Sequence, residues 1–140
     1  MTDIDAQSHD PWTYRARVSP TADVVDGDTL DPTIDLGFGT IRRGREARIR
    51  LLGVDTHEIH TVSDDSEEYQ RGWREKQFVE HWLMKAREEH DGDFPLLLRT
   101  VKGDERGKYG RWLAEVYRLW DGECLNERLK EEFEGVATDV

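Results

Sequence analysis

Residues 48–58 read Arg-Ile-Arg-Leu-Leu-Gly-Val-Asp-Thr-His-Glu. In the first half of this stretch, and just before it, apolar and charged side chains alternate, which is typical of a half-buried β-strand. The second half contains a glycine and two carboxylates, Asp55 and Glu58, which stop the alternation. The pattern predicts a strand over residues 46–54, with Arg50 on it and acidic groups where it ends.

Strand and helix signals on both sides of this stretch define the rest of the fold. Proline interrupts the first two expected strands, at Pro20 and Pro32, because it cannot donate to a strand ladder. The expected strands are 12–25, 29–36, 46–54, 94–101 and 109–119, and the expected helices are 67–89 and 125–134. This order predicts an α+β, mainly β fold. It fits an OB-like five-stranded barrel, with one helix between strands 3 and 4 and a second, C-terminal helix.

The domain organisation follows from length and composition. A chain of 140 residues fits a single domain, and we expect it over residues 12–140, after a flexible acidic tail at residues 1–11. No apolar run is long enough to cross a membrane, and the N-terminus lacks the pattern of a secretory signal. We therefore expect a monomeric cytoplasmic protein without membrane contacts, or a secreted one that has already been processed.

The formal net charge of -11 is unusual for a protein that would bind polyanions. Excess Asp and Glu with only five lysines is expected of a halophilic protein, because high salt screens the self-repulsion. An ordinary acidic protein is the alternative. Four arginines nevertheless form a local basic run, which either follows a nucleic-acid backbone or is a solvated hairpin paired with nearby acids. They are Arg42, Arg43, Arg45 and Arg48.

Four short segments contain residues with a chemical role. Taken singly, each has an ordinary explanation, such as a tight Asp-Gly turn or a solvated strand end. In chain order they are Val24-Val-Asp-Gly-Asp-Thr29, Arg48 to Glu58, Lys108-Tyr-Gly-Arg-Trp-Leu-Ala114 and Leu125-Asn-Glu-Arg-Leu129. As an ordered set, these segments resemble the staphylococcal nuclease (thermonuclease) family, and the resemblance spans residues 13–137. It implies a hydrolase, a calcium-dependent endonuclease that cuts DNA and RNA at the 5′ P–O bond and leaves 3′-phosphates.

The metal site is expected from both the chemistry and the resemblance. Hard divalent cations prefer carboxylate and carbonyl oxygens. Asp28 and Asp55 lie at two strand ends that adjacent strands could bring together, and the backbone carbonyl of Thr56 is a third donor. The resemblance implies the same three Ca²⁺ ligands. Asp26 is expected to orient the site or a bound water, or else to stabilise its own turn.

The resemblance also implies roles for the remaining residues. Guanidinium groups suit phosphate because they remain charged and can hold two oxygens at once. Arg50 is expected to clamp the phosphate and Arg111 to stabilise the transition state, while Glu58 accepts a hydrogen bond from the attacking water. Tyr109 and, more weakly, Lys108 would contact the nucleotide or a flanking phosphate. Asn126 and Glu127 are expected to hold the last helix against the barrel.

The sequence departs from the family at several places, and one segment near His57 raises the question of a different metal. His57 replaces a proline, which predicts a less rigid loop around Glu58. The segment 57–60 reads His-Glu-Ile-His, but zinc is disfavoured because the spacing and the loop context do not match a metalloprotease. The chain lacks the C-terminal tyrosines that stack on the base in the family's prototype. A catalytically weak OB-fold module that binds nucleic acid or protein is therefore the alternative function, and an acidic mimic of nucleic acid is a third.

Overall fold

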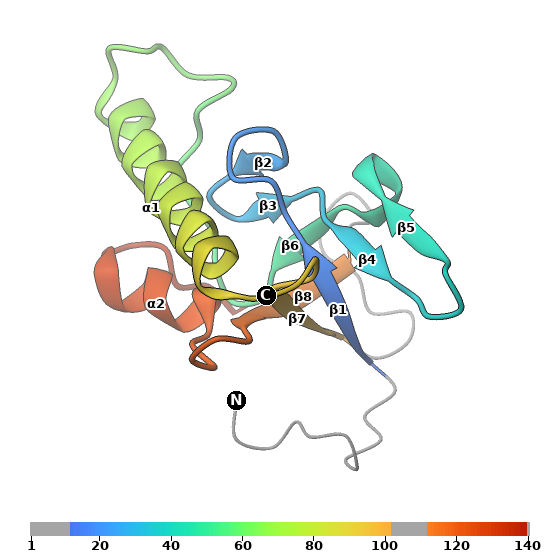
Figure 1. Ribbon diagram of the computed structural model, residues 1–140. Helices are drawn as coiled ribbons and strands as arrows, with labels where there is room; N and C mark the ends of the chain where they lie inside the picture. Colours follow the sequence, from blue (N-terminus) through green and yellow to red (C-terminus); the bar gives the residue numbers. More distant parts are fainter. Residues whose placement is uncertain (1–11, 102–111, 140) are drawn as a thin grey trace.

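The computed structural model describes residues 12–101 and 112–139 of the chain, and these contain eight strands, one short 3-10 helix and two α-helices. Both α-helices lie at the left of the sheet in Figure 1, and the hairpin of β4 and β5 forms the edge of the sheet at the right. The elements are β1 Thr13–Arg17, β2 Val24–Asp26, β3 Thr29–Leu30, β4 Thr33–Asp35, β5 Ile41–Arg43, η1 Gly44–Ala47, β6 Ile49–Leu51, α1 Glu67–Glu89, β7 Leu96–Thr100, β8 Trp112–Arg118 and α2 Leu125–Glu132.

The eight strands form one sheet in the order β2-β3-β6-β8-β7-β1-β4-β5. All neighbouring strands are antiparallel except β6 and β8, which run parallel with Arg50 opposite Leu113. The fold is therefore α+β and mainly sheet, as predicted. The position of α1, after β6 and before β7, is also the predicted one.

The strands are shorter than the sequence predicts. Pro32 separates β3 from β4, because proline cannot complete the ladder. The prediction of a continuous strand over 46–54 is wrong, since Gly44–Ala47 is a 3-10 helix and β6 contains only Ile49–Leu51. Strand β5 was not predicted, because its three side chains are all exposed and show no apolar alternation.

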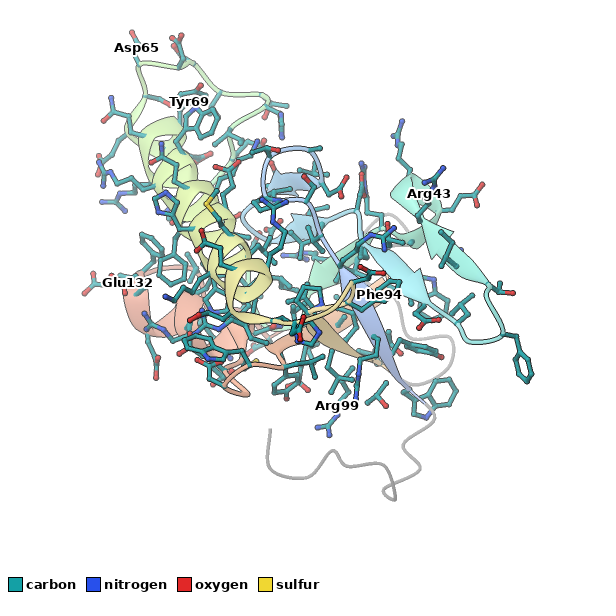
Figure 2. All side chains as sticks on the ribbon, in the orientation of Figure 1. Arg43, Asp65, Tyr69, Phe94, Arg99 and Glu132 are labelled. Carbon is teal, nitrogen blue, oxygen red and sulfur yellow. The ribbon has the colours of Figure 1, made fainter. Side chains whose placement is uncertain are left out.

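Helix α1 is the element that sequence periodicity describes best, and its bounds match the prediction. Ser66 caps its N-terminus by accepting a hydrogen bond from the Tyr69 amide at 3.1 Å. Figure 2 shows Asp65 and Tyr69 at this end of the helix. One face of the helix packs into a single cluster of buried residues shared with the sheet and α2; on α1 this cluster contains Val79, Trp82, Leu83 and Ala86.

Asn126 attaches α2 to the sheet, as predicted. Its Nδ2 donates to the carbonyls of Leu52 and Ala114 at 2.9 and 3.0 Å, and its Oδ1 accepts from the Val116 amide at 3.0 Å. The prediction that Glu127 also holds α2 against the sheet is wrong, because its exposed carboxylate pairs with Lys130 on α2 itself at 2.7 Å.

Candidate functional site

The two strand ends with carboxylates lie next to each other. Asp28 directly precedes β3, which pairs with β6 so that Thr29 lies opposite Arg50. The Asp28 side chain, 7% exposed, accepts the Thr56 amide on Oδ2 at 2.9 Å and the Thr29 hydroxyl on Oδ1 at 2.8 Å. The predicted juxtaposition of Asp28 with the segment Asp55-Thr56 is therefore present.

Arg50 lies beneath this segment, with only 4% of its surface exposed. Its Nη2 lies 3.0 Å from Oδ1 of Asp55 and donates to the Val54 carbonyl at 3.2 Å. The Asp55 carboxylate is 60% exposed, so one of its oxygens is engaged by the guanidinium while the group faces solvent. A buried arginine thus orients an exposed carboxylate beside Asp28.

Asp26 and Glu58 add further negative charge. Burial raises the pKa of Asp26, and the neighbouring carboxylates of Asp28 and Glu58 raise it further, whereas His60 opposes the shift. Oδ1 of Asp26 is buried, and its partner is His60 Nε2 at 2.6 Å, which forms an ion pair with it when the imidazole is protonated. Glu58 is exposed, and its Oε1 accepts the amides of Ile59 and His60 at 3.0 and 2.8 Å.

Three predicted site residues, Lys108, Tyr109 and Arg111, lie outside the described residues. Within residues 12–101 and 112–139, no three His, Cys, Asp or Glu side chains converge as a metal-binding group. The predicted calcium site differs from such a group because it has two carboxylates and a backbone carbonyl. In the same ranges, neither helix has the length and apolarity needed to span a bilayer.

Comparison with known protein families gives no matching family model. The chain is similar to Uncharacterized protein MJ1439 of Methanocaldococcus jannaschii, with 30% identity over 128 residues. The similarity covers 78% of this chain and 57% of the archaeal protein, so the chain spans little more than half the length of that relative.

The loop that follows Asp55 is anchored to α1 by Glu75. This side chain is 1% exposed, and its two carboxylate oxygens lie 2.8 Å from the His57 amide and 2.7 Å from His57 Nδ1. The replacement of proline by His57 predicts a less rigid loop. The structure instead gives His57 two contacts to one buried group, which hold the backbone between Thr56 and Glu58.

The end of the chain anchors the other side of the same loop. The Asp55 amide donates to the Val136 carbonyl at 2.7 Å, and the Thr138 amide donates to the Gly53 carbonyl at 3.0 Å. Val54 and Ala137 form an antiparallel bridge between these bonds. The segment that contains Asp55 is therefore held by α1, by the last residues described and by Arg50.

Two glycines allow α1 to approach the site closely. A Cβ on Gly27, between Asp26 and Asp28, would lie 2.8 Å from Thr56 Cγ2 and 3.3 Å from the Glu75 carbonyl carbon. A Cβ on Gly72 would lie 2.5 Å from the His57 carbonyl oxygen, far inside contact distance. Both contacts include backbone, so a side chain at either position displaces the site from the helix.

We expect Gly72→Ala to lower the free energy of unfolding by about 1–3 kcal/mol, because the added methyl overpacks the contact with His57. Helix propensity alone predicts the opposite sign, a gain of about 1 kcal/mol. Urea unfolding with Gln77→Ala, an exposed position on the same helix, as control measures the effect. A Gly72→Ala variant at least as stable as the wild type would show that the loop does not pack there.

The anchoring residue Glu75 was missed in the sequence, although a signal for it was present. It falls on the apolar face of α1, at helical spacing with Gly72 and Val79, where a carboxylate needs a partner. The partner, His57, is 18 residues away in a loop, and no local pattern identifies such a pair. The Val136 contact is missed for the same reason.

Proposed function

We propose that this chain is a calcium-dependent endonuclease that hydrolyses phosphodiester bonds of DNA and RNA. The observation that supports the proposal best is the position of Arg50. It is buried, charged at any working pH, and directed at Asp55 in a loop whose Thr56 amide binds Asp28. A buried guanidinium beside exposed and partly buried carboxylates suits the joint binding of a cation and a phosphate.

The strand pairing supports the OB-like barrel that this proposal implies. β1 and β2, β3 and β4, and β5 and β6 are consecutive pieces interrupted by short breaks. Counted as three bent strands, they make five with β7 and β8. The first then pairs with the second and fourth, and the third pairs with the second and fifth. Strand 4 also pairs with strand 5, and this pattern of pairing supports a closed barrel.

The donor atoms fit Ca²⁺ better than a softer metal, because all of them are oxygens. Asp28, Asp55 and the Thr56 carbonyl would hold the ion, with Asp26 next to them. Burial and the neighbouring carboxylates of Asp28 and Glu58 raise the pKa of Asp26, so negative charge is crowded at this point, and a bound cation would relieve the crowding. When bound, calcium would neutralise phosphoryl charge and provide a water for attack.

Residues of the chain would bind the phosphate, stabilise the transition state and position the attacking water. Arg50 would hold the scissile phosphate and keep Asp55 oriented, and Arg111 would bind charge that develops in the transition state. Glu58 would accept a hydrogen bond from the attacking water, while Tyr109 and Lys108 would contact the nucleotide. Water adds to phosphorus, the 5′ P–O bond breaks, and the 5′ oxygen leaves as a hydroxyl with the proton lost from water. The product keeps a 3′-phosphate.

Cleavage of fluorescent single-stranded DNA tests the proposal. We expect the wild type to cut in calcium and to be inactive in EGTA. The assay is run in low and in molar KCl, because an acidic chain can need salt to screen its self-repulsion and stay folded. Asp28→Asn should lower the rate by at least about 100-fold, because it weakens the cation's hold. Labelled products should become substrates for polymerase extension only after phosphatase treatment, as 3′-phosphates require.

The matched control is Asp64→Asn, which removes an exposed carboxylate from the loop before α1 and should leave the rate unchanged. A folded wild type that binds DNA but cuts it under none of these conditions would instead indicate the binding module. Cleavage that persists in EGTA would contradict the proposed dependence on calcium.

A further inference from the structure

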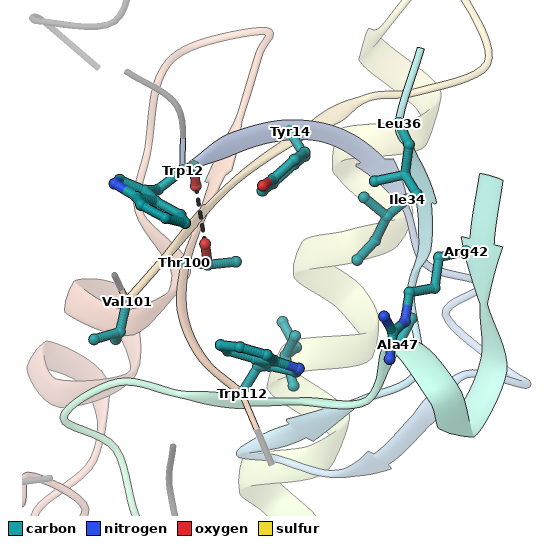
Figure 3. Close-up of a pocket in the computed structure, with 10 residues that line it drawn as sticks. Trp12, Tyr14, Ile34, Leu36, Arg42, Ala47, Thr100, Val101 and Trp112 are labelled. Carbon is teal, nitrogen blue, oxygen red and sulfur yellow. Dashed lines mark hydrogen bonds between the residues drawn. The ribbon is translucent and has the colours of Figure 1, made fainter. Parts of the chain in front are cut away.

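An aromatic pocket opens between β1, β4, β6 and β8 (Figure 3). It encloses about 170 Å³, below the roughly 300–1,000 Å³ of pockets for drug-sized ligands, so it suits one ring system. In Figure 3 Trp12 and Tyr14 lie along the top of the opening and Trp112 lies at the bottom, while Leu36 and Arg42 lie at the right, across from Trp12. The lining residues are Trp12, Tyr14, Ile34, Leu36, Arg42, Ala47, Ile49, Thr100, Val101 and Trp112.

The hairpin of β4 and β5 continues this pocket with an exposed apolar tip. Phe38 is fully exposed and has φ 55, between Gly37 and Gly39, which also have positive φ. A phenylalanine in the left-handed region is strained, and here the side chain gains no packing in return. Leu36 and Ile41 beside it are 45% exposed. These three residues contribute little to folding, so they indicate a surface that binds something.

The same hairpin has positive charge in a protein of net charge -11. Arg42, Arg43 and Arg45 are exposed, and none forms an ion pair with another residue in the described ranges. Arg43 projects from β5 in Figure 2. Only Arg48 is neutralised, because its Nε and Nη2 bind the two oxygens of Asp31 at 2.7 and 2.9 Å. Among the residues that the structure describes, acid pairing therefore explains Arg48 and does not explain the other three arginines of this basic run.

We propose that the pocket and the hairpin bind single-stranded nucleic acid: one base enters the pocket, and the flanking phosphates lie along Arg42, Arg43 and Arg45. Base faces stack on aromatic rings and guanidinium planes, and phosphates require cations, so this ligand matches both halves of the surface. An apolar peptide would use the rings but provide no negative charge for the three arginines. The inference rests on the proposed function for its ligand class only, because none of the described lining residues is a proposed cleavage residue.

Anisotropy of a fluorescein-labelled oligothymidylate in EGTA measures this binding without cleavage. We expect Trp12→Leu to weaken it about tenfold, as the loss of one stacked base predicts, and still to do so in molar KCl. Trp120→Leu is the matched control, since Trp120 is 45% exposed and lies outside the pocket. An oligomer of equal length with abasic sites should bind the wild type and Trp12→Leu equally. Equal binding of oligothymidylate by Trp12→Leu and Trp120→Leu would contradict the proposal that a base binds in the pocket.

The hairpin is tested by two variants that should fold normally. Phe38→Gly removes an exposed ring and the strain of its backbone, so weaker binding together with an unchanged or higher melting temperature is expected. Arg43→Gln should reduce the slope of log K against log salt by about 0.7, the value for one phosphate contact on a single strand. Arg87→Gln, an exposed arginine on α1, is the control. If neither hairpin variant differs from its reference, the hairpin does not bind nucleic acid.

The outcomes separate this inference from the nuclease proposal. Binding that depends on Trp12 and Arg43, without cleavage in calcium, would support the pocket and contradict the nuclease. Cleavage in calcium with unchanged binding by all three variants would support the nuclease and contradict the pocket.

Discussion

Arg50→Lys is expected to lower kcat/KM for single-stranded DNA about 100- to 1,000-fold, the range seen when one preorganised donor to a reacting group is removed. The native guanidinium reaches Asp55 at 3.0 Å and the Val54 carbonyl at 3.2 Å from a position with 4% exposure. Lysine keeps the charge but presents a single ammonium, which cannot bind Asp55, the carbonyl and a phosphate oxygen in one fixed fork. Initial rates at low substrate measure the loss.

A matched control separates this effect from the general cost of replacing arginine. Arg48→Lys makes the same change two residues away, at a side chain that is 25% exposed and paired with Asp31. We expect a change in kcat/KM of less than threefold there. The free energy of unfolding of Arg50→Lys should fall by only about 1 kcal/mol, for one lost hydrogen bond. Equal losses of activity in the two variants would mean that Arg50 has no special role.

Sequence predicts the part of the site whose residues lie on or next to two adjacent strands. Asp28, Asp55 and Thr56 meet because β3 and β6 are adjacent in the sheet, and Arg50 is on β6 itself. Their types and order were enough to predict a cation and phosphate site. Lys108, Tyr109 and Arg111 fall outside the described residues, so their predicted roles stay predictions.

Long-range anchors could not be predicted, because their partners share no local pattern. Glu75 holds His57 from 18 residues away, and the Val136 carbonyl binds the Asp55 amide from the far end of the chain. The fold shows the same division. The 23-residue helix α1 repeats its apolar spacing often enough to fix both ends, whereas strand β5 has three exposed residues and no repeat.

Glu75→Ala is expected to destabilise the protein by about 1–3 kcal/mol, because the His57 amide and ring lose the buried acceptor that satisfies them. The His57 amide and ring both lose their acceptor, and a cavity forms under the loop. That loop contains Thr56 and Glu58 on either side of His57. We therefore also expect the calcium concentration for half-maximal cleavage to rise about 10- to 100-fold, as when a group that orients a metal ligand is removed. Chemical unfolding and calcium titrations of the rate measure the two effects.

Glu75→Gln distinguishes positioning from simple loss of packing. The amide fills the same space and keeps one oxygen that can accept the His57 amide, so most of the stability and the calcium response should return. Glu88→Ala, at an exposed position of the same helix, should change neither quantity. If Glu75→Ala lost stability but titrated with calcium as the wild type does, Glu75 would support only the fold. A shift in both quantities, reversed by glutamine, would mean that the contact between α1 and His57 sets the geometry of the cation site.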